Sequence, residues 1–129
     1  MDEVKYVSID IGSNAMRASV FIIDSANDLE VLETFRYPLR LGEDTFLNGK
    51  ISKNKFKKVE NAFADLLENL KSYEIREIFA VATSAIRDAE NGKDLIAHIK
   101  KEYNIEIKLI NGGGFDNVGN FTEQCQNSL

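Results

Sequence analysis

The chain has 129 residues, enough for one domain with a buried core but few for a two-domain enzyme. Hydrophobic residues make up 43% of it and charged residues 29%, a balance that excludes a disordered or low-complexity chain. The net charge of -5 offers no extended basic surface, so we expect no nucleic acid polymer as a partner. A polyanion would have to bind at a local site.

Cellular location is indicated by the cysteine content and by the N-terminus. Cys125 is the single cysteine, so no intrachain disulfide can form, which is typical of proteins from a reducing cytoplasm. The acidic N-terminus lacks the basic start and apolar run of a signal peptide. No segment approaches the ~18 apolar residues of a membrane span. We therefore expect a cytoplasmic protein with no membrane partner.

The first third of the chain predicts three strands, over residues 4–11, 16–24 and 29–37. Short polar segments separate them, too short for helical crossovers, so the strands should form an antiparallel meander. In the third strand, alternation predicts Val31, Glu33, Phe35 and Tyr37 on one face.

The second third predicts an amphipathic helix over residues 53–73, with Ser52 as its N-cap. A strand follows over residues 76–83, then a helix beginning at Asn91 or Gly92, and a last strand over residues 105–110. The order βββαβαβ is that of an α/β, ribonuclease-H-like domain of the actin-like ATPase type, with a mixed sheet flanked by helices. We assign this phosphate-binding domain to residues 1–111. Residues 112–129 lack a periodic pattern and are expected to form a divergent, flexible tail.

One candidate site is the segment Asp10-Ile11-Gly12-Ser13-Asn14, at the end of the first strand. Gly12 would allow a sharp turn, and the backbone N–H groups of Gly12, Ser13 and Asn14 could converge on a phosphate. Asp10 would hold Mg²⁺. An ordinary hairpin turn would use the same residue types, so the segment alone leaves both interpretations open.

A second candidate site spans residues 82–91, at the end of the fourth strand. Arg87 could bind phosphate oxygens bidentately, with Thr83 and Ser84 as further donors. If the first and fourth strands are parallel, both segments lie at the same edge of the sheet. The alternative is a capped helix start with a solvated Arg87.

Other polar residues favour structural roles. The segments from Arg40 to Glu43 and from Leu47 to Lys50 are typical of turns. The lysine-rich run 50–58 indicates the solvated face of its helix, although it could also attract a polyanion. We expect His98 to be solvated. Cys125 has no partner base and no catalytic role.

Taken together, DIGSN at 10–14, RLGE at 40–43 and ATSAIRDAEN at 82–91 resemble the Ppx/GppA phosphatase family over residues 4–112. The resemblance implies a two-domain, actin-like hydrolase that removes terminal phosphates from polyphosphate or guanosine pentaphosphate with Mg²⁺. It places Asp10 at the metal, and the substrate contacts at Gly12, Ser13, Asn14, Arg17, Thr83, Ser84 and Arg87.

The chain departs from the family pattern after Gly112. The family has two glutamates there, one of them the proposed general base, whereas this chain has Gly114 and Phe115. Neither residue can take a proton from water, so no catalytic residue is assigned. The glycine-rich phosphate loop of the family's second domain is also absent. We therefore expect a truncated or frame-shifted chain that is inactive alone.

Two other functions stay open at this point. The chain could be a non-catalytic module that binds polyphosphate or nucleotide, or a fragment of an actin-like kinase. In each case the cleft face that a second domain normally covers would be exposed. Self-association through that face is expected.

Overall fold

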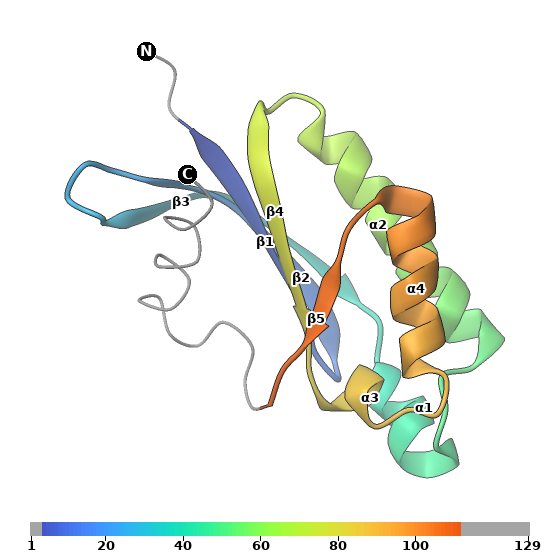
Figure 1. The fold of residues 1–129 in the computed structure, drawn as a ribbon. Helices are drawn as coiled ribbons and strands as arrows, with labels where there is room; N and C mark the ends of the chain where they lie inside the picture. The colour runs from blue at the N-terminus through green and yellow to red at the C-terminus, as the bar shows by residue number, and fades with distance from the viewer. Residues whose placement is uncertain (1–3, 112–129) are drawn as a thin grey trace.

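The computed structural model describes residues 4–111 and consists of one five-stranded sheet with helices packed on it (Figure 1). The strands are β1 (Lys5–Ile11), β2 (Ala15–Ile23), β3 (Leu29–Pro38), β4 (Ile75–Ala82) and β5 (Ile107–Leu109). The helices are α1 (Leu41–Asn48), α2 (Lys53–Leu70), α3 (Ser84–Arg87) and α4 (Gly92–Tyr103). With the two short helices α1 and α3 set aside, the order is the expected βββαβαβ, and the α/β fold is confirmed.

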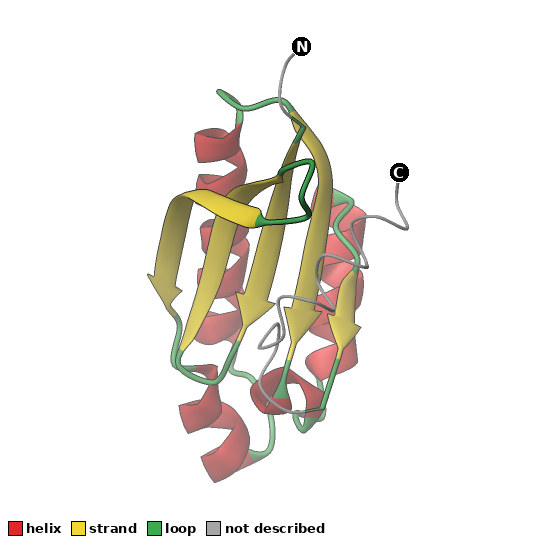
Figure 2. Ribbon diagram, turned by 90° about the vertical axis from the view of Figure 1, so that its left-hand side faces the viewer, coloured by secondary structure: helices red, strands yellow, loops and turns green. Residues whose placement is uncertain are grey.

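Strand directions bring four carboxyl ends to one edge of the sheet. The order across the sheet is β3-β2-β1-β4-β5. β2 is antiparallel to both β1 and β3, whereas β1 is parallel to β4 and β4 is parallel to β5. The chain therefore leaves β1, β3, β4 and β5 at the same edge, which we call the carboxyl edge (Figure 2). This is the edge where open α/β sheets bind ligands.

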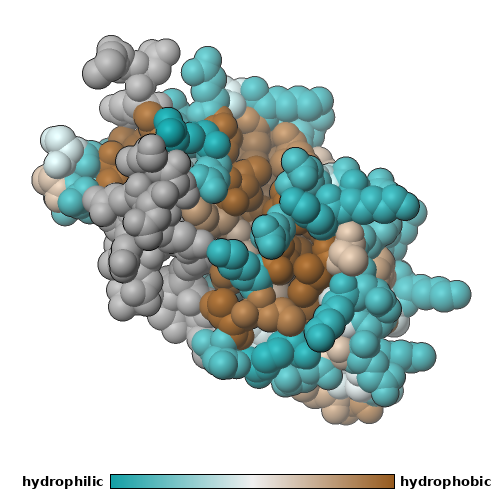
Figure 3. Space-filling view, in the orientation of Figure 1, coloured by the Kyte–Doolittle hydropathy of each residue, from teal (hydrophilic) through white to brown (hydrophobic). Residues whose placement is uncertain are grey.

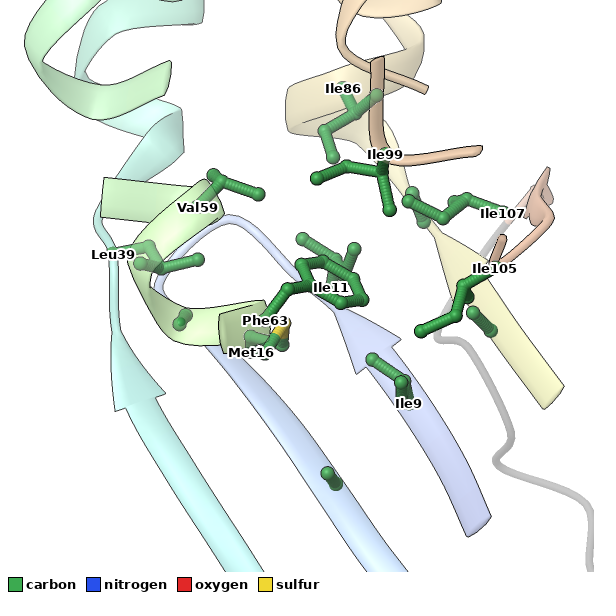
Figure 4. Packing of buried hydrophobic residues seen from close by; sticks show 14 of the residues in the cluster. Ile9, Ile11, Met16, Leu39, Val59, Phe63, Ile86, Ile99, Ile105 and Ile107 are labelled. Carbon is green, nitrogen blue, oxygen red and sulfur yellow. The ribbon is translucent and has the colours of Figure 1, made fainter. Parts of the chain in front are cut away.

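The main core lies between the sheet and helices α2 and α4, which cover the same face (Figures 1 and 2). Alternate residues of β1, such as Ile9 and Ile11, point into it and meet Phe63 of α2 and Ile99 of α4 (Figure 4). Burial of such side chains contributes roughly 1.5–3 kcal/mol each. Leu39 and Ile86 join the same core from the segments after β3 and β4, so the core also fixes these two loops.

The opposite face of the sheet carries a smaller aromatic cluster. The Tyr6 ring stacks on Phe21 at a centroid distance of 5.6 Å and lies 6.2 Å from Phe79. Among residues 4–111, no helix covers this face (Figures 1 and 2). Hydrophobic residues also reach the surface between hydrophilic ones in the orientation of Figure 3.

Most predicted elements agree with the structure within three residues, and Ser52 caps α2 as expected, because its Oγ accepts the Lys55 N–H. One face assignment is wrong. The register of β3 shifts next to Leu32, so that Val31 pairs with Phe21 while Glu33 pairs with Val20. This β-bulge places Val31 on the face opposite Glu33.

The other errors concern helices. The residues of helix α1 were predicted to form two separate chain turns instead of a helix. Helix α2 ends at Leu70 rather than at residue 73. The expected tail, residues 112–129, lies outside the described residues. No helix in the described part of the chain could span a membrane.

Candidate phosphate-binding site

Three segments that are distant in sequence meet at the carboxyl edge. The turn between β1 and β2, the segment that leads into α1, and the start of α3 follow β1, β3 and β4, respectively. The Oγ atoms of Ser13 and Ser84 lie 3.3 Å apart. The Thr83 N–H donates to the Ile11 carbonyl at 3.2 Å, which extends the parallel pairing of β1 and β4 into the loops. The expected convergence of residues 10–14 with residues 82–91 is confirmed.

The β1–β2 turn directs its carbonyl groups toward the segment that leads into α1. The Ser13 carbonyl accepts the Gly42 N–H at 3.0 Å, and the Asn14 carbonyl accepts the N–H groups of Leu39 and Arg40. Within residues 4–111, the N–H groups of Ser13 and Asn14 donate to no backbone carbonyl. Two backbone donors are therefore available at the turn for a ligand.

Glycine is not required at position 12 by the backbone conformation. Gly49 is the only glycine of the described chain with a positive φ, and a Cβ on Gly12 would meet the Ala15 carbonyl at an ordinary 3.6 Å. The turn is closed instead by the Gly12 N–H, which donates to Ala15 at 3.0 Å. The expectation that Gly12 is needed for the sharp turn is thus wrong.

Asp10 and Arg17 face each other across β1 and β2. Both lie on the sheet face opposite α2 and α4, because the neighbours of Asp10, Ile9 and Ile11, point into the helical core. Asp10 is half-buried and Arg17 is exposed. The two side chains therefore lie beside the turn at residues 12–14.

Arg87 is an exposed residue that is hydrogen-bonded to its own protein. Its Nε lies 3.1 Å from Asp88 Oδ1, and its Nη1 donates to the Ile110 carbonyl at 3.2 Å and to Asn111 Oδ1 at 3.3 Å. The side chain is one-third exposed. The Arg87 guanidinium thus has partners within the protein, which neither interpretation of the sequence predicted.

The segment after β3 is more than the plain turn that the sequence predicted. Arg40 adopts a left-handed conformation with φ of 53°, and the Lys55 ammonium donates to the carbonyls of Leu39 and Arg40 at 3.1 and 3.0 Å. Left-handed non-glycine residues are uncommon and cluster at functional sites. The Thr45 hydroxyl of α1 donates to the buried Ala85 carbonyl at 2.6 Å, which joins α1 to α3.

Several sequence signals could have revealed α1. Glu43 and Asp44 stand in its first turn, where acidic residues favour a helix, and Gly49 ends it in the left-handed conformation. Lys55 was predicted to be solvated, but its side chain is only 12% exposed.

His98 was also expected to be solvated, but its side chain is only 32% exposed. Its Nε2 is buried 3.1 Å from Glu60 Oε2, at an ion-pair distance without the angle of a hydrogen bond, and its ring lies 5.5 Å from that of Phe56. The residue joins α4 to α2, away from the carboxyl edge. Two surface grooves, of about 410 Å³ beside Phe56 and of about 510 Å³ beside Ile78, are lined by no residue of the β1–β2 turn, of the segment that leads into α1 or of α3.

The residues that could hold a metal are few. Within residues 4–111 there is no cluster of three or more histidine, cysteine, aspartate or glutamate side chains that could hold an ion. Asp10 is the one carboxylate that the resemblance places at the metal. A single carboxylate fits Mg²⁺, which commonly takes one or two protein ligands together with phosphate oxygens and water. Gly114, Phe115 and Cys125 lie outside the described residues.

Comparison with known proteins supports the same family. Residues 19–114 match the Ppx/GppA phosphatase family. Exopolyphosphatase 1 of Mycobacterium tuberculosis is 31% identical over 104 residues, which cover 81% of this chain and 30% of the relative. A bifunctional 3-dehydroquinate synthase/phosphatase of Fusobacterium nucleatum is 33% identical over 118 residues, with 81% of this chain and 17% of the relative covered.

Solved structures agree in fold. The crystal structure of the Aquifex aeolicus Ppx/GppA family member superposes with a TM-score of 0.78 at 22% identity, covering 85% of this chain and 36% of that one. An exopolyphosphatase from Cytophaga hutchinsonii gives 0.76 at 25% identity, covering 84% and 34%. The chain therefore spans about a third of the length of these solved structures and of the mycobacterial relative, and 17% of the Fusobacterium nucleatum relative. On the family match over residues 19–114, this chain belongs to the Ppx/GppA phosphatase family.

Proposed function

We propose that this chain supplies the phosphate-binding half of a phosphoanhydride hydrolase whose substrate is inorganic polyphosphate or guanosine pentaphosphate. The supporting observation is the contact between Ser13 and Ser84, because it joins the β1–β2 turn to the start of α3 at the carboxyl edge. The two hydroxyl groups lie side by side, and the N–H groups of Ser13 and Asn14 belong to the turn that carries the first of them. A chain of phosphates requires such a set of donors.

The cations of the proposed site have different roles. Arg17, exposed beside Asp10, is positioned to attract the substrate electrostatically. Arg87 supplies a planar guanidinium suited to two phosphate oxygens. Mg²⁺ held at Asp10 would neutralise negative charge on the phosphates. Backbone and side-chain donors would orient the terminal phosphate.

The hydrolytic step needs a base that this chain does not provide at the family position. Gly114 and Phe115 stand where the family has glutamates, and neither can accept a proton from water. General-base assistance contributes about 10²–10⁴-fold to a rate. We therefore propose that residues 1–129 bind the substrate and hydrolyse it at most slowly by themselves.

Binding of polyphosphate by isothermal titration calorimetry tests this function. In the presence of Mg²⁺, Arg87→Ala should weaken binding about 10- to 100-fold, as expected for a lost charge-assisted hydrogen bond. Ser13→Ala should weaken it less. Arg76→Ala removes the same charge from an exposed residue at the start of β4, at the opposite end of the strand, and should change affinity less than about twofold.

Equal losses in Arg87→Ala and Arg76→Ala would overturn the proposal, since they would show unspecific attraction. Phosphate release well above a blank, abolished by Arg87→Ala, would overturn the part that concerns turnover. Guanosine pentaphosphate in the same assay distinguishes the two substrates. Stabilisation by ATP but not by polyphosphate would favour an actin-like kinase.

A non-catalytic binding module is the second candidate. The observation that favours it is the replacement of the family's glutamates by Gly114 and Phe115. Micromolar affinity for polyphosphate combined with no turnover would support this function. Turnover in the isolated chain would exclude it.

A further inference from the structure

Arg87 already has hydrogen-bond partners along two edges of its guanidinium. On one edge, Nε lies 3.1 Å from Asp88 Oδ1 and Nη2 lies 3.5 Å from Asp88 Oδ2. Nη1 donates to the Ile110 carbonyl and to Asn111 Oδ1. A guanidinium has five N–H groups, and these contacts involve four of them. A ligand that needs two parallel N–H groups must therefore displace one of the present partners.

The two sets of partners differ in how easily they can leave. The Ile110 carbonyl belongs to a fixed backbone, because the Ile110 N–H donates to Ala82 at 3.0 Å at the end of β4. Apart from Arg87, no residue within 4–111 is bonded to the Asp88 carboxylate, and the residue is anchored by its backbone N–H, which donates to the Ser84 carbonyl at 2.9 Å. Its side chain is 50% exposed and can rotate into water. Displacement of the carboxylate therefore disturbs the fold least.

The Asp88 carboxylate also has the shape of what would replace it. Carboxylate and phosphate each present two oxygen atoms to the Nε–Nη2 edge of an arginine. They cannot occupy this edge together, and their like charges repel at such a distance. A phosphate with more than one negative charge would interact more strongly with the guanidinium than Asp88 does.

We propose that Asp88 is an internal competitor for the ligand: its carboxylate occupies the edge of Arg87 to which a terminal phosphate binds, and the phosphate displaces it. This inference rests on the proposed function, of which it describes the regulation. Only molecules in which Asp88 has rotated away are competent to bind through Arg87. The apparent affinity is lowered by the fraction of such molecules. Nη1 meanwhile keeps Arg87 tied to the end of β5, so the guanidinium stays in position during the exchange.

Substitution of Asp88 tests the proposal directly. Asp88→Asn keeps the size of the side chain but removes the charge, and we expect the affinity for inorganic tripolyphosphate to rise about fivefold or more, since Arg87 is released. Glu90→Gln is the matched control. It removes the same charge two residues away, from an exposed side chain that is not among the residues assigned to the ligand, and should raise affinity less than about twofold. In the double variant Arg87→Ala/Asp88→Asn the gain should disappear.

The outcomes separate the two claims. If Arg87→Ala weakens binding but Asp88→Asn tightens it no more than Glu90→Gln, the competitor role is wrong and the phosphate-binding function stands. If wild type and Arg87→Ala bind equally, the proposed function fails. If no variant binds tripolyphosphate, Asp88→Asn included, both fail. Thermal melts of all variants verify that Asp88→Asn is folded, as expected for an exposed side chain.

Discussion

A methyl group on the Cα of Gly92 would lie 1.9 Å from the carbonyl oxygen of Ile86. Helix α4 thus begins in direct contact with the backbone of α3, the short helix that carries Ser84 and Arg87. Only glycine allows this approach, because the neighbouring atom belongs to a backbone that is anchored in the core through Ile86. The geometry of the candidate site depends on it.

Gly92→Ala should therefore destabilise the protein by about 3 kcal/mol, at the upper end of the cost of overpacking. Urea unfolding measures the change. Gly12→Ala is the control, since its methyl group would make an ordinary contact at 3.6 Å, and it should stay within about 0.5 kcal/mol of wild type. Equal stability of Gly92→Ala and wild type would contradict the close packing of α3 and α4.

Lys55→Met should cost about 1–3 kcal/mol, because the carbonyl groups of Leu39 and Arg40 would lose a charged donor. Methionine keeps much of the apolar stem, so the effect reports on the ammonium group. Lys57→Met, at an exposed position of the same helix, should be nearly neutral. The two variants are compared by thermal or urea unfolding. Equal losses would show that Lys55 does not hold the turn at Arg40.

Tyr37 should contribute stability that disappears in alkaline solution. Burial, and next the hydrogen bond that its hydroxyl donates to Asp65 at 2.8 Å, raise the pKa of Tyr37 from 10.0 to about 12. The neutral phenol is thus favoured in the folded state. The stabilisation is complete below pH 10 and is lost as the pH rises toward 12.

Tyr37→Phe should accordingly be about 1 kcal/mol less stable than wild type at pH 7, with a difference that shrinks above pH 10. Urea unfolding of both proteins from pH 7 to pH 11 measures this difference, in which other titrating groups cancel. A constant difference over the whole range would argue against the interaction with Asp65.

Self-association through the cleft face remains a prediction, and the sheet face opposite α2 and α4 is a second apolar surface that no helix of residues 4–111 covers. Val31 is 52% exposed and pairs with Phe21, so it shares the face of the aromatic cluster. If copies associate there, sedimentation should show a concentration-dependent increase in mass that Val31→Glu abolishes. Leu47→Glu, at an 82% exposed position on α1, should leave the increase unchanged. A monomer at all concentrations would refute the prediction.

Periodic features of the sequence predicted the fold well. The apolar spacing that predicted α2 and the short polar gaps that predicted the meander of the first three strands are local patterns, which a single sequence contains. Helix α1 was missed because Leu-Gly and Asn-Gly are common in turns. Contacts with residues distant in sequence stabilise the helix instead, among them the hydrogen bonds from Gly42 to Ser13 and from Thr45 to Ala85.

The sequence predicted which segments meet at the candidate site, but not the contacts that their side chains make. Strand direction alone indicated that the segments after β1 and β4 meet. The partners of Arg87 at Ile110 and Asn111 lie more than twenty residues away in sequence, and no local pattern contains them. The bulge next to Leu32 is similar, since it reflects the pairing of β3 with β2 rather than any property of the leucine.

The position of β1 and β4 inside the sheet has a consequence for the unliganded protein. Each has a hydrogen-bonded strand on both sides, and the Thr83 N–H continues their pairing into the loop. Amide protons in such strands exchange with solvent mainly when the whole domain opens. The backbone that presents Ser13 and Ser84 should therefore be preorganised. The backbone at this edge should change little when a ligand binds, so that side-chain rotations such as that of Asp88 are the main rearrangement.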